Sequence, residues 1–446
     1  MAILLSPDQF GVVYMVTAFT NFAFVFSDFG LSTVTLQKAD LSHRESSNLF
    51  WLNTLSGLIL FLLGVALANP IGMLYGDERI PSIVICSSLI FLINGVYIQH
   101  SALIRRDMRF KQFVVVEITA LFVSTMLGII VAFLTGSYWS IVIAMIARSV
   151  TQATGFISLS KFRPTAYSST VRVREMLTLG ADVALFDMIN YWSRNIDNVV
   201  VGKFLGPDSL GLYKKAYDLL LLPVTQVRAP LASVALPHMS KMQQDPQNVS
   251  LVYSRLISSL SLVTTTIVVL AVVACEYLVP LVLGEEWVEV STLFKYLAPA
   301  AMVQGPIGTL GLLLLSLNQS RKYLKWGAAH AAVMIVAIIS GSLMGMMELA
   351  MIYSAANILV SVPSIFYCTR GTFVNPVALT KKIYEPIIVG AGVMFVSFAV
   401  DTGSLFRDTL IGLVLSGLVM ICYFIINNEK FSLIGDVSKK LLAKVR

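Results

Sequence analysis

The sequence predicts an all-α polytopic membrane protein, and three observations point to that class. Hydrophobic residues make up 57% of the 446 residues and charged residues only 13%, whereas a soluble domain carries about a quarter charged residues. Apolar runs of about 20 residues, the length that crosses the hydrocarbon core, recur from end to end. The charges lie in short loops between those runs. We therefore expect one membrane domain with almost no soluble mass.

Thirteen apolar runs are long enough to be membrane-spanning helices. They cover residues 10–33, 48–73, 82–103, 113–134, 138–159, 176–201, 210–236, 252–283, 290–317, 324–344, 350–368, 383–400 and 409–426. The run at 252–283 is long enough to include an interfacial turn.

The loops alternate in charge along the chain. One set is basic, as at Arg105, Arg106 and Arg109, and the other set is acidic, as at Asp77 and Glu285. The positive-inside rule places the basic set and the C-terminal tail in the cytoplasm, with Met1 outside. The net charge of +7 and the pI near 9.1 would favour nucleic-acid binding in a soluble protein. Here topology explains them, and we expect no nucleic-acid partner.

An internal repeat is visible at two places. Residues 5–11 match residues 205–211, and residues 75–78 resemble residues 283–286. Both pairs lie in predicted outside loops, as in a parallel duplication of a multi-helix unit with a site between the halves. We expect an N-terminal lobe at 1–160, a C-terminal lobe at 161–370, and an additional helix pair with a cytoplasmic tail at 371–446. The first copy has no counterpart of the helix at 176–201, so the plan is fourteen helices lacking the first.

The predicted helix at 176–201 carries the densest set of polar residues. Asp187, Asn190, Arg194, Asp197 and Asn198 follow spacings of three and four, which places them on one stripe. Such groups are costly inside a membrane unless they face a cavity or a partner. One interpretation is a water-filled translocation cavity with Arg194 available to an anion. The other is a buried Arg194–Asp197 pair that holds two helices together.

Four further residues are candidates. Lys214 and Lys215 either contact substrate or extend to the membrane interface. Asp28 is either an ion-coupling group or an interfacial acid at a helix end. Glu117 lies deep enough to need a partner, as does Arg148, and is a second candidate for ion coupling.

Other chemistry finds no support in the residues. The four cysteines lie inside apolar runs, and no histidine has a second ligand type at metal spacing. The chain has no phosphate-binding loop of the GxxxxGK[ST] type. We expect no metal, no cofactor and no enzyme activity.

Seven short blocks in a fixed order carry a family resemblance. They lie at 4–11, 27–31 with Gln37, 105–110, 193–202, 205–207, 211–213 and 284–287. The chain resembles the polysaccharide transporter (oligosaccharide flippase) family of the multidrug/oligosaccharidyl-lipid/polysaccharide exporter superfamily, and within it the colanic-acid/lipopolysaccharide exporter type. The likeness runs to about residue 300 and is only hydropathic beyond that point.

The resemblance implies a two-lobed helical bundle around a central cavity, with extra helices at the C-terminal end, and it implies a function as well. It implies flipping of an undecaprenyl-pyrophosphate-linked oligosaccharide across the bacterial inner membrane by alternating access, with a cationic cavity for the pyrophosphate. It also implies contact with membrane lipid, and with polysaccharide polymerase and export proteins. An alternative is an ion-coupled drug or small-solute antiporter of the same superfamily. A membrane polymerase or ligase is disfavoured because every predicted outside loop is short.

Overall fold

The computed structural model describes residues 1–27, 30–38, 40–168, 174–242, 245–399 and 402–427, and within these the side chains of 25–26, 37, 174–194 and 246 lie outside the description. The described residues contain helices and no strand. Ten helices of this part are long and apolar enough to cross a membrane. The predicted all-α membrane fold is confirmed.

The helices follow one another along the chain. Their bounds are α1 Pro7–Ser27, α2 Leu31–Gln37, α3 His43–Tyr75, α4 Ile80–Arg106, α5 Phe110–Thr135, α6 Trp139–Leu159, α7 Arg174–Lys241, α8 Pro246–Leu283, α9 Val288–Ile307, α10 Leu310–Ser316, α11 Ser320–Ser342, α12 Met346–Thr369, α13 Pro376–Phe398 and α14 Leu405–Ile426. Short 3₁₀ turns lie at Ala2–Leu4 and Glu285–Trp287.

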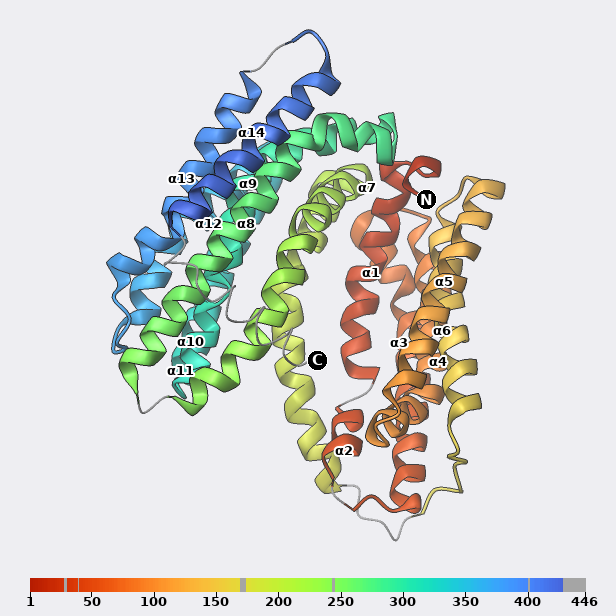
Figure 1. Cartoon of the computed structure of the whole chain (residues 1–446). Helices are drawn as coiled ribbons and strands as arrows, with labels where there is room; N and C mark the ends of the chain where they lie inside the picture. The colour runs from red at the N-terminus through yellow and green to blue at the C-terminus, as the bar shows by residue number, and fades with distance from the viewer. Residues whose placement is uncertain (28–29, 39, 169–173, 243–244, 400–401, 428–446) are drawn as a thin grey trace. The chain divides into compact units, whose positions relative to one another are not determined.

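The chain divides into two compact units, Met1–Gly211 and Leu212–Arg446. In the first unit, α3 packs on α4, α5 packs on α6, and α4 packs on α6 (Figure 1). In the second unit, α8 packs on α9, α11 packs on α12, and α9 packs on α12. Both units therefore repeat one order of helix pairing, as the predicted duplication requires. The expected boundaries at 160 and 370 stay a prediction.

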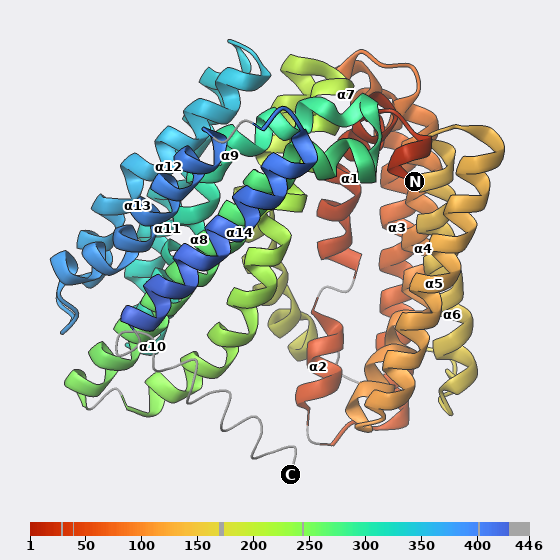
Figure 2. The ribbon, with the colours of Figure 1, turned by 45° about the horizontal axis from the view of Figure 1, so that its top comes forward.

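The last two helices are additions to the second unit. The α13 helix packs on α8 and on α14, and α14 lies along α8 (Figure 2). They have no counterpart in the pairing order of the first unit. Asn375 begins α13 by accepting hydrogen bonds from the backbone N–H groups of Val377 and Ala378, which satisfies the free donors of a helix start.

Four of the predicted runs have different boundaries in the structure. The run at 10–33 is divided between α1 and α2, with Gly30 at φ 67° before α2, a conformation that favours glycine. The run at 290–317 is divided between α9 and α10, and the runs at 176–201 and 210–236 form α7 with a kink at Gly206, φ 82° and ψ 178°. The kink at Gly206 lies between two runs that the sequence already separated, whereas hydropathy alone cannot locate the breaks inside 10–33 and 290–317, because apolar residues lie on both sides of each.

Ten of the thirteen predicted runs correspond to the ten apolar helices. The other three are 10–33, 176–201 and 383–400. Much of 176–201 lies outside the described side chains, and α13, which contains 383–398, carries Lys381, Lys382 and Glu385 near its start.

Basic residues hold helix C-termini at one end of each unit. Arg106 donates to the carbonyl oxygens of Thr35 and Lys38 at the end of α2, and Arg109 donates to that of Leu159 at the end of α6. In the second unit Lys322 donates to the carbonyl oxygen of Cys368 at 3.1 Å, near the end of α12. Cations stabilise helix C-termini because the free carbonyls carry partial negative charge. The residues that the charge alternation assigned to one side therefore also stabilise the fold.

Candidate functional site

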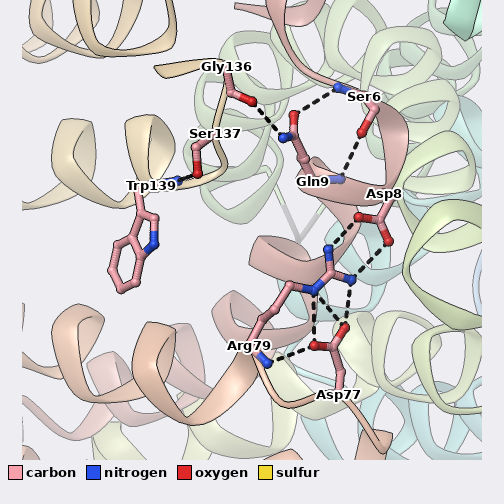
Figure 3. Close-up of polar contacts among 8 residues, drawn as sticks. All are labelled: Ser6, Asp8, Gln9, Asp77, Arg79, Gly136, Ser137 and Trp139. Carbon is pink, nitrogen blue, oxygen red and sulfur yellow. Dashed lines mark hydrogen bonds and ion pairs between the residues drawn. The ribbon is translucent and has the colours of Figure 1, made fainter. Parts of the chain in front are cut away.

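An ionic cluster lies at the opposite end of the first unit, where α1 begins and α3 and α4 meet (Figure 3). Arg79 Nη1 lies 2.5 Å from Asp8 Oδ2, and Arg79 Nη2 lies 2.7 Å from Asp77 Oδ2. The hydrogen bond from Arg79 lowers the pKa of Asp77 below its usual range, and the two carboxylates raise the pKa of Arg79. The cluster ties three segments that the sequence assigned to one side of the membrane.

Gln9 adds a second tether at the same end. Its Nε2 donates to the carbonyl oxygen of Gly136 at 2.7 Å, while its Oε1 accepts from the backbone N–H of Ser6 (Figure 3). Gly136, at φ 55°, ends α5 in the left-handed conformation, which leaves its carbonyl accessible to the amide. The first of the two repeated motifs thus holds the end of α5 as well as the start of α4.

The two copies of the repeated motif pack on each other inside the first unit. A Cβ added to Gly11 would lie 1.7 Å from the carbonyl oxygen of Pro207, and one added to Gly211 would lie 2.0 Å from that of Pro7. Only glycine permits so close an approach of two backbones. The contact is reciprocal, since each glycine meets the proline of the other copy. The repeat found in the sequence is therefore a packing motif.

The polar stripe of α7 is described only in part. Asp197 and Asn198 are buried, with 7% and 5% of their surface exposed. Asp197 Oδ1 accepts the backbone N–H of Asn198 at 2.9 Å, and Asn198 Oδ1 accepts no hydrogen bond within the described part of the chain. The side chains of Asp187, Asn190 and Arg194, and residue Asp28, lie outside the described residues. The choice between a cavity lining and an Arg194–Asp197 pair stays open.

Glu117 has the partner that its depth requires. Its Oε2 lies 3.5 Å from Nη2 of Arg148 on α6, and both of its carboxylate oxygens accept from Nε2 of Gln152 at 3.0 Å. Tyr97 on α4 donates to Oε1 of Gln152 at 3.0 Å. The four side chains connect α4, α5 and α6 inside the apolar part of the first unit. The sequence identified both charged residues but did not pair them.

Lys214 and Lys215 are each held by a neighbour in the second unit. Lys214 Nζ lies 2.7 Å from Asp218 Oδ1, one helical turn away, and 5.7 Å from the ring centre of Tyr217. Lys215 Nζ lies 5.4 Å from the ring centre of Trp287. Contacts of this kind stabilise a cation on an aromatic face. Lys214 and Lys215 therefore belong to a local network of charges and rings.

A neutral polar network that the sequence did not reveal connects α7, α9 and α12. Gln304 Nε2 donates to Tyr353 Oη at 2.7 Å and to Asn357 Oδ1 at 3.1 Å. Tyr353 Oη also lies 3.3 Å from Tyr217 Oη. The only sequence signal was a tyrosine and an asparagine four residues apart in an apolar run, which is too common to single out.

No metal site is visible among the described residues, because no group of three or more acidic, histidine or cysteine side chains comes together there. The cysteines of this part are free, and Cys275 and Cys368 are buried.

Comparison with known proteins identifies the family. The family described as polysaccharide biosynthesis protein matches residues 1–292. The chain belongs to this family. The recognition made from the ordered sequence blocks is thus confirmed for the part of the chain in which those blocks lie.

Two relatives illustrate the range of the family. The chain is 22% identical over 388 residues to the teichuronic acid biosynthesis protein TuaB of Bacillus subtilis, covering 86% of this chain and 80% of the relative. It is 23% identical over 350 residues to the lipopolysaccharide biosynthesis protein WzxC of Escherichia coli, covering 77% and 70%.

Two solved structures share the fold. The lipid II flippase MurJ matches with a TM-score of 0.74 at 15% identity, covering 96% of this chain and 95% of MurJ. A multidrug resistance transporter of the MATE family matches with a TM-score of 0.63 at 12% identity, covering 84% and 92%. As a member of this family with this fold, the protein is a multi-pass membrane protein of polysaccharide biosynthesis and export.

Proposed function

We propose that the protein flips an undecaprenyl-pyrophosphate-linked oligosaccharide across the bacterial inner membrane by alternating access. The observation that carries this proposal is membership of the polysaccharide biosynthesis family over residues 1–292. The succinoglycan biosynthesis transport protein ExoT of Rhizobium meliloti, 22% identical over 79% of this chain, adds a relative described as a transporter. No enzymatic step is part of the proposal.

Charge placement supports an orientation. The ends of the units at which Arg106, Arg109 and Lys322 hold helix C-termini are the basic ends. Under the positive-inside rule these ends face the cytoplasm, and the C-terminal tail lies there as well. The Asp8–Arg79–Asp77 cluster then lies outside. A polysaccharide polymerase and export proteins are the partners that this orientation would serve.

The contact residues are proposed from the sequence pattern. Asp187, Asn190, Arg194, Asp197 and Asn198 would line the substrate path, with Lys214 and Lys215 further along α7. Burial of Asp197 and Asn198 is compatible with a lining that closes between transport steps. Asp28 and Glu117 are the candidates for ion coupling, and Glu117 is held by Arg148 and Gln152.

Replacement of Arg194 tests the proposed anion contact. We expect Arg194→Ala to reduce polysaccharide export about tenfold or more in a flippase-null strain, since a charge-assisted hydrogen bond contributes about 1.5–3 kcal/mol. Arg194→Lys should retain part of the export because the charge persists. The matched control is Arg321→Ala, which removes an exposed arginine at the start of α11. Full export by the normally inserted Arg194→Ala protein would contradict the assignment.

Drug resistance on overexpression tests the alternative, an ion-coupled drug or small-solute antiporter. The fold shared with the MATE transporter favours it as the second candidate. Overexpression would then raise drug resistance, and that resistance would fall in Glu117→Gln. If drug efflux appears while the flippase-null strain stays without surface polysaccharide, the antiporter replaces the flippase proposal.

A further inference from the structure

The amide of Gln304 is held in one orientation by its neighbours. Asn357 Nδ2 donates to the carbonyl oxygen of Tyr353 at 2.9 Å, so the Oδ1 of Asn357 is the atom that faces Gln304. Gln304 must therefore present its Nε2 hydrogens to Asn357 and Tyr353. Both partners are buried, with 4% and 7% of their surface exposed. The geometry fixes the remaining atom, Gln304 Oε1, on the opposite side of the amide.

That oxygen is an acceptor without a donor. Within the described residues, no group donates to Gln304 Oε1, and the atom is not sealed inside the unit. Gln304 itself is only partly buried. A fixed acceptor of this kind costs no reorganisation when a donor arrives, which makes it a good contact for a ligand hydroxyl.

Further groups for a polar ligand are linked to the amide through Tyr353 and lie along α7. Tyr217 and Gln304 both lie within hydrogen-bonding distance of the hydroxyl of Tyr353. Tyr217 is half-buried and offers a ring face, and Asp218, with 43% of its side chain exposed, offers a carboxylate. The charge of Asp218 is balanced by Lys214 at 2.7 Å. The surface formed by Gln304, Tyr217, Lys214 and Asp218 is polar, partly aromatic and neutral overall.

This composition selects against an anion. A pyrophosphate needs donors or unbalanced cations, whereas Gln304 Oε1 and Asp218 are acceptors and Lys214 is already paired. A sugar needs acceptors for its hydroxyls and a ring face for its C–H groups, and this surface has both.

We propose that Gln304, Tyr217 and Asp218 form a subsite for a neutral sugar of the transported oligosaccharide. Hydroxyl groups of the sugar donate to Gln304 Oε1 and to Asp218, and the sugar ring lies against Tyr217. Tyr353 and Asn357 are positioning residues, since they act through Gln304. The inference rests on the proposed function for the identity of the ligand.

Binding by the purified full-length protein tests the subsite with two probes. One is undecaprenyl pyrophosphate without sugar, and the other is the same lipid carrying one neutral oligosaccharide. We expect Gln304→Ala to weaken binding of the glycosylated lipid by about two- to tenfold, the effect of one neutral hydrogen bond. Binding of the bare lipid should not change. The control is Gln226→Ala, which removes an exposed glutamine of α7 and should leave both affinities unchanged.

Two more variants separate a subsite from a structural role. Tyr353→Phe keeps the ring but removes the hydroxyl that holds Gln304, so it should weaken only the glycosylated probe, and by less than Gln304→Ala. Asp218→Asn keeps an acceptor and should retain more affinity than Asp218→Ala. An equal loss for both probes in Gln304→Ala, or no loss for either, overturns the subsite.

The wild type distinguishes failure of the subsite from failure of the function. If it binds the two lipids equally, the sugar subsite is wrong and the flippase proposal stands. If it binds neither lipid, the flippase proposal is wrong, and the subsite falls with it.

Discussion

The bridge between α4 and α6 in the first unit and the bridge between α9 and α12 in the second stand at corresponding places of the duplication. Tyr97 and Gln152 form the first, and Gln304 and Asn357 form the second, 207 and 205 positions later. Both use an uncharged side-chain pair across two helices that correspond in the pairing order of the units. The first bridge continues to Glu117 and Arg148, whereas the second continues to Tyr353 and Tyr217.

The comparison separates the features that the two copies share from the side chains in which they differ. The pairing order of the helices and the reciprocal Gly11 and Gly211 contact are common to the two copies. The groups beyond the bridge are charged in one copy and neutral in the other. A charged group suits ion coupling, and a neutral hydrogen-bonding group suits a sugar. Three predictions test how far this comparison holds.

The largest effect should come from replacing the two glycines of the reciprocal contact that the copies share, Gly11 and Gly211. Gly11→Ala places a methyl group 1.7 Å from the Pro207 carbonyl oxygen, and Gly211→Ala places one 2.0 Å from that of Pro7. Because backbone atoms are in the way, the segments must separate, at a cost of about 3 kcal/mol. We expect both variants to lower the melting temperature in detergent and the level of export, to a similar degree.

The matched control for these variants is Gly327→Ala in α11, where nothing lies within 4 Å of the added Cβ. That change should stabilise the helix by about 0.5–1 kcal/mol. If Gly11→Ala is as stable as the wild type, the close contact between Gly11 and Pro207 is not a fixed feature of the fold.

A smaller effect is expected for the Glu117–Arg148 pair, which among the described residues has no charged counterpart beyond the bridge of the second unit. We expect a double-mutant cycle of Glu117→Gln and Arg148→Gln to give a coupling of about 0.5–1 kcal/mol in thermal unfolding. The value is modest because 30% and 49% of the two side chains are exposed. The Lys295–Glu276 pair, also partly exposed, is the control. It should couple less because, within the described residues, no side-chain amide donates to Glu276 as Gln152 donates to Glu117. Equal coupling energies in the two pairs would contradict the prediction that the Glu117–Arg148 pair is the more strongly coupled one.

The smallest effect should depend on pH. Arg79→Gln removes the partner of Asp8 and Asp77, whose bonds are partly exposed, and should lower stability by about 0.2–0.5 kcal/mol at pH 7. Because the pKa of Asp77 lies below its usual value of 3.8 in the folded protein, the stabilisation is present above about pH 4. It is lost as the pH falls through the lowered pKa.

Unfolding measured from pH 7 to pH 3 should therefore show wild type and Arg79→Gln converging only at the acid end. Arg407→Gln, at an exposed arginine of α14, should run parallel to wild type throughout. A gap between wild type and Arg79→Gln that widens below pH 4 would be the opposite of the expected sign.

Sequence reasoning found residues more readily than partners. It singled out Glu117 and Arg148 because an ionisable group in an apolar run is conspicuous, but their separation by 31 positions concealed the pair. It found the repeat at 5–11 and 205–211 but not that the two copies touch. It missed Gln304, Tyr353 and Asn357, because neutral polar residues are ordinary in membrane helices and only their convergence is unusual.

The sequence by itself determined that this is a duplicated helical membrane protein of a polysaccharide transporter family. Hydropathy and charge alternation are local or periodic properties, and they can be read without knowing which helices meet. Only the tertiary structure decided where the runs at 10–33 and 290–317 break, which carboxylates Arg79 and Arg148 hold, and which amide is fixed with its oxygen free. Those outcomes depend on contacts between residues far apart in the chain, and the packing of helices alone brings them together.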